Sequence, residues 1–136
     1  MFENAALLAD IFGRWPSFHD AEVVSVNLCR SGAPGPTLEI CIYVFEMTPE
    51  VDASGHYVLR NHTDVVLQFT GVDLQGMAWI NSQNVIDDLI MSEIEPAEHE
   101  GRRWLVEIVP IYGLGATFEC VGATVLSVLP HQADAV

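Results

Sequence analysis

The sequence predicts an α+β domain in which an N-terminal helix packs on a strongly curved, mainly antiparallel sheet of seven or eight strands. Three observations lead to this fold, and they leave open whether the curved sheet closes into a barrel. Apolar residues recur at helical spacing near the N-terminus, over residues 3–12. From Glu22 onward, apolar and polar residues alternate with a period of two between short turn-like segments. Helices and strands do not alternate along the chain, which argues against a parallel sheet.

The predicted helix ends at Gly13, a residue type that commonly stops helices, and Pro16 hinders its continuation. A first strand begins at Glu22, and the glycine- and proline-rich residues 31–36 form the turn after it. The second strand, residues 38–45, is mostly apolar on both faces. Strands covered on both sides have this pattern, so we expect it near the centre of the sheet.

The remaining elements follow from the same alternation, with a turn at 52–55. We expect strands at 56–60, 64–74, the later half of 85–94, 103–111, 116–121 and 123–129. Between them lie a bend at Asn61 and His62, an irregular segment at 77–84, an acidic loop at 97–101 and a bulge or bend at Gly122. Since no linker or repeat divides the chain, residues 1–136 are predicted to form a single domain.

Charge and cysteine content narrow the classes of function. The chain has 19 acidic and 5 basic residues, a formal net charge of −14, which argues against binding nucleic acid or an anionic membrane. The acidity fits either self-repulsion that keeps a protein dispersed or a surface shaped for a basic partner. Three widely spaced cysteines and an N-terminus without a signal-like pattern predict thiols rather than disulfides and a cytoplasmic location.

Acidic residues gather before Arg102, and two interpretations of them stay open. They fit a solvated edge strand and loop, and they also fit a docking surface for a basic protein. The candidate partner-binding residues are Asp87, Asp88, Glu93, Glu95, Glu98 and Glu100.

The run from Trp15 to Val23 places His19 beside Asp20 where the chain enters the sheet. Catalysis needs a convergent set of titratable groups, and the sequence lacks a nucleophile elbow and a phosphate-binding glycine loop. Neighbouring strand residues point to opposite faces, so His19 and Asp20 do not readily chelate one ion. The other histidines considered as metal ligands are His56, His62 and His99. We therefore predict no enzymatic activity, no metal and no cofactor.

A structural role is the favoured interpretation of His19 and Asp20, with partner contact and catalysis as alternatives. Ser17 to Asp20 has the spacing of a capping box, and Asp20 can hold nearby backbone or the imidazole. Trp15 and Phe18 are expected to close the end of the core, the alternative being an exposed aromatic anchor for a partner.

The run Trp15-Pro16-Ser17-Phe18-His19-Asp20-Ala21-Glu22-Val23 resembles the signature of the immunity protein 50 family of bacterial polymorphic toxin systems. The segment Asn81-Ser82-Gln83-Asn84-Val85-Ile86 looks like a second point of similarity. The resemblance implies a non-enzymatic protein that binds a cognate toxin stoichiometrically and neutralises it; the acidity is compatible with a nuclease toxin. The family motif, expected to be structural, comprises Trp15, Pro16, Phe18, His19, Asp20 and Glu22.

Two other functions stay open. One is a small ligand-binding or hydrolytic β-barrel that uses His19 and Asp20. The other is a self-associating structural module. A homodimer is compatible with the second of these and with an immunity protein.

Overall fold

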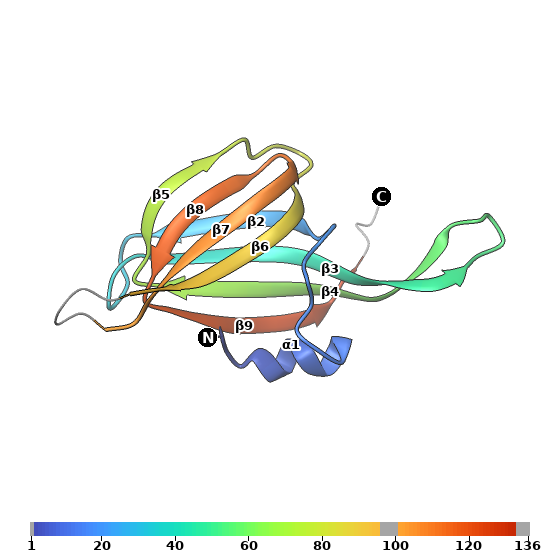
Figure 1. The fold of residues 1–136 in the computed structure, drawn as a ribbon, viewed down its shortest axis with the longest axis horizontal. Coiled ribbons are helices and arrows are strands. Elements are labelled where there is room, and N and C mark those ends of the chain that lie inside the picture. Colours follow the sequence, from blue (N-terminus) through green and yellow to red (C-terminus); the bar gives the residue numbers. More distant parts are fainter. Residues whose placement is uncertain (1, 96–100, 133–136) are drawn as a thin grey trace.

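The structure, a computed structural model, describes residues 2–95 and 101–132 (Figure 1). In these residues one helix, α1 (Ala5–Phe12), lies between the first and second strands of a nine-stranded sheet with strand order β1-β9-β4-β3-β2-β6-β7-β8-β5. The strands are β1 (Phe2–Glu3), β2 (Glu22–Cys29), β3 (Thr37–Val51), β4 (Tyr57–Thr70), β5 (Asp73–Ala78), β6 (Val85–Ile94), β7 (Arg103–Tyr112), β8 (Gly115–Cys120) and β9 (Gly122–Pro130). The α+β class is thus confirmed. Within the described ranges, no helix is long and apolar enough to cross a membrane.

The expected strand number and the barrel are wrong, because the sheet has nine strands and remains open. It consists of two halves, β1-β9-β4-β3-β2 and β6-β7-β8-β5, which face each other in Figure 1. The halves meet where β2 pairs with β6 at Glu22 and Val85. Closure would require β5 to pair with the far edge, but its partner in the described sheet is β8. The far edge is the two-residue β1, which pairs with β9 in parallel.

Several predicted boundaries also change. The strands expected at 56–60 and 64–74 are one continuous β4 that ends at Thr70. Asn61 has a left-handed φ of 56°, yet a register shift between Val44 and Glu46 of β3 absorbs the distortion without ending the pairing. Strand β6 covers all of 85–94, and Gly122 is the first residue of β9. The expected acidic loop lies, except for Gly101, outside the described residues.

The hydrophobic core lies between the two halves. Alternate residues of β3 from Leu38 to Val44 are buried, and β3 lies between β4 and β2 as predicted. Phe69 of β4 meets Phe118 of β8 edge to face, with ring centroids 4.9 Å apart, so the pair joins one half to the other. Helix α1 buries Leu8 and packs against β9 and β4.

The hairpin of β3 and β4 extends past the body of the protein (Figure 1). Met47, Val51 and Tyr57 are exposed on this extension, which we call the hairpin arm and define as residues 46–60. A two-stranded ribbon alone is marginal in water, and here Arg60 forms an ion pair with Glu50 across it.

Candidate functional site

The loop that carries the family motif runs from α1 to β2 and contains two left-handed residues. Phe18 has φ 63° and Asp20 has φ 68°, which is uncommon for residues other than glycine. The backbone N–H of Ala21 donates to the carbonyl of Phe18 at 3.0 Å and closes the turn. This conformation directs the Phe18 side chain into the core, where it is 2% exposed.

The aromatic residues of the motif lie at the end of the core. Trp15 contacts Phe18 edge to face at 5.6 Å, and on its other side it stacks on Phe2 at 4.7 Å. Phe2 reaches Phe69 in turn. The chain Phe18–Trp15–Phe2–Phe69 therefore covers the core between α1 and the sheet, and Trp15 is only partly buried.

His19 connects the loop to β6. Its Nδ1–H donates to the carbonyl oxygen of Asp87 at 3.0 Å, and the Asp87 carboxylate lies 3.3 Å from the same nitrogen. The carboxylate of Asp20 lies 3.6 Å from Nε2. The hydrogen bond to the Asp87 backbone, followed by the charge of Asp20, raises the pKa of His19 above its ordinary 6.5. Acceptors next to both ring nitrogens favour the protonated form of the ring, which agrees with the direction of this pKa shift.

Ser17 and Asp20 do not form the reciprocal capping box that their spacing suggested. The Ser17 hydroxyl accepts from the backbone N–H of His19 at 3.2 Å. The backbone N–H of Asp20 donates instead to the carbonyl of Ile86 at 2.9 Å, and the N–H of Ile86 donates to Ala21 at 2.8 Å. These bonds join the motif loop to the start of β6.

Asn84 holds the same junction from the other side, and the sequence had indicated it only as part of a family-like run. Its side chain is buried, with 5% exposure, and uses both donors and its acceptor. Oδ1 accepts from the backbone N–H groups of Asn81 at 2.9 Å and Leu114 at 3.1 Å. Nδ2 donates to the carbonyl of Asn81 at 2.6 Å and reaches that of Val23 at 3.5 Å. One side chain therefore ties together three segments far apart in the sequence.

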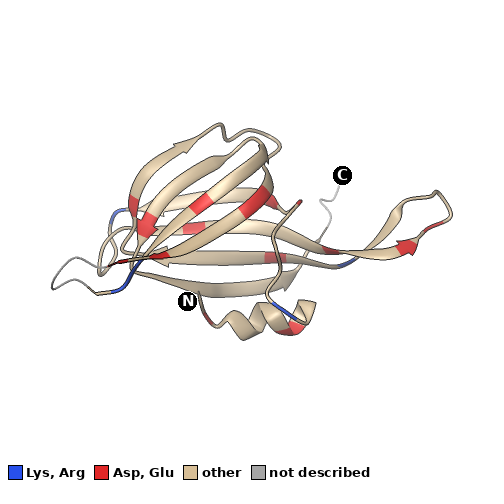
Figure 2. Ribbon diagram, in the orientation of Figure 1, with Lys and Arg blue, Asp and Glu red and all other residues tan. Residues whose placement is uncertain are grey.

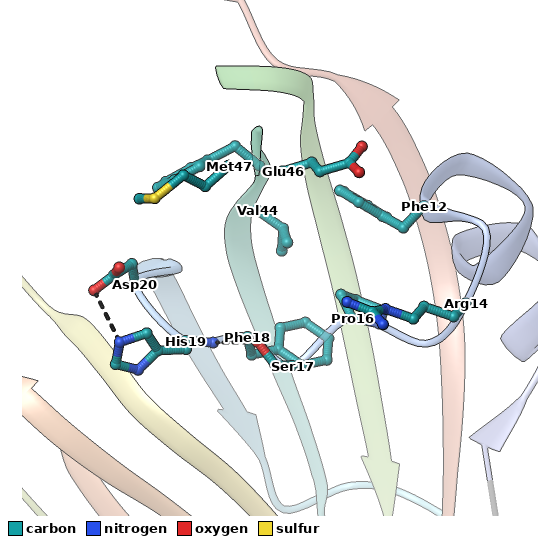
Figure 3. A pocket seen from close by; sticks show the side chains of 11 residues that line it. Phe12, Arg14, Pro16, Ser17, Phe18, His19, Asp20, Val44, Glu46 and Met47 are labelled. Atoms are coloured by element: carbon teal, nitrogen blue, oxygen red, sulfur yellow. Dashed lines mark hydrogen bonds and ion pairs between the residues drawn. The ribbon is translucent and has the colours of Figure 1, made fainter. Parts of the chain in front are cut away.

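A cavity of about 280 Å³ lies beside the motif, between the loop and the root of the hairpin arm (Figure 3). Its polar lining comes from Arg14, Ser17, His19, Asp20 and Glu46. In Figure 3, His19 and Asp20 lie together on one side, whereas Arg14 lies on the opposite side. Glu46 accepts a hydrogen bond from Asn61 at 2.8 Å. The titratable groups thus line the cavity without converging on one point. The His19 side chain remains 54% exposed.

The histidines considered as metal ligands are not gathered. His62 lies near Tyr43, with its Nδ1 2.5 Å from the phenol oxygen, while His56 belongs to the tip of the hairpin arm. His99 lies outside the described residues. Within the described part of the chain, no three His, Cys, Asp or Glu side chains lie close enough to hold a metal ion.

The acids that we predicted to form one partner-binding surface differ in their surroundings. Asp87 lies against His19, and Glu93 forms an ion pair with Arg102 at 2.9 Å. Asp88 and Glu95 are exposed, while Glu98 and Glu100 lie outside the described residues. The role of these acids in binding stays a prediction.

The structure adds acidic residues from neighbouring strands that the sequence did not group. Cross-strand pairing places Asp88, opposite Val109, on the outer face of the half formed by β5 to β8. The pairing of β5, β7 and β8 places Glu107, Glu119 and Asp73 on the same face. Figure 2 shows acidic positions along these neighbouring strands. Because they come from four strands, alternation in one segment could not reveal the set.

The fold and the motif geometry define a small α+β protein in which a His-Asp loop joins an N-terminal helix to an open, curved sheet. The sequence model described as Immunity protein 50 matches residues 4–131. The chain therefore belongs to the immunity protein 50 family, which confirms the resemblance of its motif. No curated protein and no solved structure matches the chain.

Proposed function

We propose that this protein is a cytoplasmic immunity protein that neutralises a cognate bacterial toxin by stoichiometric binding. The family match over residues 4–131 carries this proposal. The geometry of His19 is compatible with a structural role of the family motif, since its ring lies between the carboxylates of Asp20 and Asp87 and connects the motif loop to β6. Binding, without turnover, is the activity that such a protein would need.

The charge of the chain supports a basic toxin, with a nuclease as the leading class. A nuclease presents a basic groove to nucleic acid, and an acidic protein competes for such a groove by charge complementarity. The net charge of −14 also accelerates encounter with a cationic surface. We assign the exposed acids of β6 and the segment after it, Asp88 and Glu95, to this steering role.

The experiment is a rescue assay with the toxin domain encoded next to this gene. Cells that express the toxin domain should die without this protein and survive with it, and the two chains should co-purify at one-to-one stoichiometry. An unrelated small acidic protein expressed to the same level controls for charge alone. Absence of binding and protection with every adjacent toxin candidate would refute the proposal.

The cavity beside the motif favours ligand binding at His19 and Asp20 as a second candidate. Since the sheet is open, this function would use a surface cavity and not a barrel interior. A thermal-shift screen with small anions and sugars tests it. The control variant is Asp20→Asn, whose melting temperature without ligand should equal that of the wild type. A ligand that raises the melting temperature of the wild type but not of Asp20→Asn would support ligand binding over toxin binding.

A further inference from the structure

Trp79 is the most exposed large hydrophobic side chain in the described residues, with 80% of its surface accessible. It lies between β5 and β6 and has a left-handed φ of 72°. The segment after it is held in place, because the Asn81 side chain donates to the Trp79 carbonyl at 3.0 Å and Asn84 holds Asn81. Hydrogen bonding of the loop backbone thus presents the indole to solvent without burying it.

A groove of about 420 Å³ lies next to Trp79 on the outer face of β5, β7 and β8. Cross-strand pairing aligns Glu107, Thr117 and Gly76 in one row across three strands, and it aligns Gly115 with Ala78 in the next. Small side chains leave this part of the face hollow. A Cβ atom on Gly76 would meet nothing within 4 Å, whereas one on Gly115 would meet the ring of Pro110 at 3.4 Å.

Apolar side chains are exposed on residues that follow the groove residues in the sequence, and the charged residue that lines the groove, Glu107, is acidic. Ile80, Ile111 and Tyr112 are exposed on the segments that continue from Trp79 and Pro110. The carboxylate of Glu107 lines the groove, and Asp88 lies on the same face one row away. Neither forms an ion pair or hydrogen bond with another described side chain. Arg103 lies at the opposite end of β7, with its Nε 3.6 Å from the carboxylate of Glu119.

We propose that this surface, the Trp79 groove (Gly76, Ala78, Trp79, Glu107, Pro110 and Thr117), is where the protein holds its toxin. The occupant is an apolar side chain of the toxin next to an arginine or lysine that pairs with Glu107. Tryptophan is enriched among the residues that dominate binding energy, and such residues gather around desolvated pockets. The inference rests on the proposed function and adds to it the interface and the chemistry of the bound segment.

Charge selects this occupant over a second copy of the chain. Two copies that met through this face would bring Glu107 and Asp88 of one toward the same carboxylates of the other. Like charges brought together in an interface oppose association, whereas a basic partner gains from the same arrangement. A partner with both an apolar and a cationic group therefore fits this groove.

The test compares pairs of variants by calorimetric titration with the adjacent toxin domain. Trp79→Ala should weaken binding by at least about tenfold, while Tyr57→Ala, an exposed aromatic on the hairpin arm, should change it less than about twofold. Gly76→Leu fills the groove and should weaken binding similarly. Gly101→Leu, also at a glycine with open space around its Cβ position, is the control. Melting temperatures show that the variants fold.

Two further measurements test the ion pair with Glu107 and the burial of Trp79 in the complex. Glu107→Gln should weaken binding several-fold and reduce its salt dependence, whereas Asp10→Asn on α1 should do neither. Complex formation should shift tryptophan emission to shorter wavelength in the wild type, because Trp79 leaves water. The shift should be lost in Trp79→Phe, which retains an aromatic ring.

The outcomes separate this inference from the proposed function. If the wild type neither binds nor protects, the proposed function is wrong and the inference falls with it. If the wild type binds and folded Trp79→Ala and Gly76→Leu bind equally well, the inference is wrong and the function stands. Loss of binding in Tyr57→Ala alone would assign the interface to the hairpin arm. A wild-type dimer that Trp79→Ala dissociates would assign the groove to a second copy.

Discussion

Replacing Asn84 with alanine should destabilise the protein more than any exposed substitution. The Asn84 side chain is 5% exposed and serves two backbone donors and the carbonyl of Asn81. Its contact with Val23 is longer, at 3.5 Å, and contributes less. Alanine removes all of these partners at the junction of β2, β6 and the start of β8.

The size of the stability loss depends on how deeply each backbone group that loses its hydrogen bond to Asn84 is buried. Leu114 is 1% exposed, so its unpaired N–H would cost about 1–3 kcal/mol. The N–H and carbonyl of Asn81 are closer to water, and losing each bond costs about 0.5–1.5 kcal/mol. The free energy of unfolding should therefore fall by about 4 kcal/mol, a large part of the 5–15 kcal/mol typical of a domain.

Urea unfolding followed by circular dichroism measures this difference. The control is Asn27→Ala, because Asn27 is exposed on β2 and its loss should change stability by less than about 0.5 kcal/mol. Asn84→Asp is a sharper second variant, since it keeps the shape but turns the donor into a carboxylate oxygen facing the Asn81 carbonyl. A loss below about 1 kcal/mol in Asn84→Ala, at an unchanged denaturant slope, would refute the role assigned to this side chain.

Three further predictions concern titration, reactivity and association. The folded state holds the pKa of His19 above 6.5, so its stabilising contribution is complete below that value and is lost as pH rises through the raised pKa. His19→Asn should therefore cost more stability at about pH 6 than at about pH 9, and an NMR pKa at or below 6.5 would contradict this. Burial raises the pKa of the Cys120 thiol to about 11, whereas Cys29 is exposed. A thiol reagent should modify Cys29 first and Cys120 only after unfolding, as mass spectrometry would show; equal rates would exclude this burial. Neutralising acids of the predicted surface should leave the fold intact and lower the rate of toxin association, with a larger effect at low salt. Stopped-flow mixing measures this association rate, and an unchanged rate would show that these acids do not belong to the interface. The residues to change are Asp87, Asp88, Glu93 and Glu95.

The strands were predictable because their signal is local. A side chain that alternates between core and solvent shows its period in a few residues, as β3 and β7 do. The number of strands was harder. Strand β1 has two residues and carries no period, and β5 covers residues 73–78, where we expected the end of one strand and the start of an irregular segment. Two expected strands also merge into β4. Alternation of apolar and polar residues could not predict that the sheet stays open, because closure depends on whether two edge strands far apart in the sequence meet.

The candidate site, too, was predictable only where its signal in the sequence is local. The motif was visible as a run of residue types, but the atom that raises the pKa of His19 belongs to Asp87, 68 positions away. The Trp79 groove is a hollow left by small residues of separate strands, and a glycine or alanine in a strand gives no sign of its neighbours. The signal that could have indicated it is Trp79 itself, next to a segment rich in asparagine.

A family motif and a binding surface can be different parts of one molecule and still depend on each other. The motif loop is hydrogen-bonded to β6 at Ile86, and Asn84 reaches both Val23, the last residue of the motif run, and Asn81, two residues after Trp79. A substitution that disturbs the motif would therefore also disturb the loop that presents Trp79, even though His19 itself need not touch the toxin. On this basis, Asn84→Ala should lower both stability and toxin affinity, whereas Trp79→Ala should lower affinity alone. The same loss of affinity in two variants would then have different physical causes, and the unfolding curves would tell them apart.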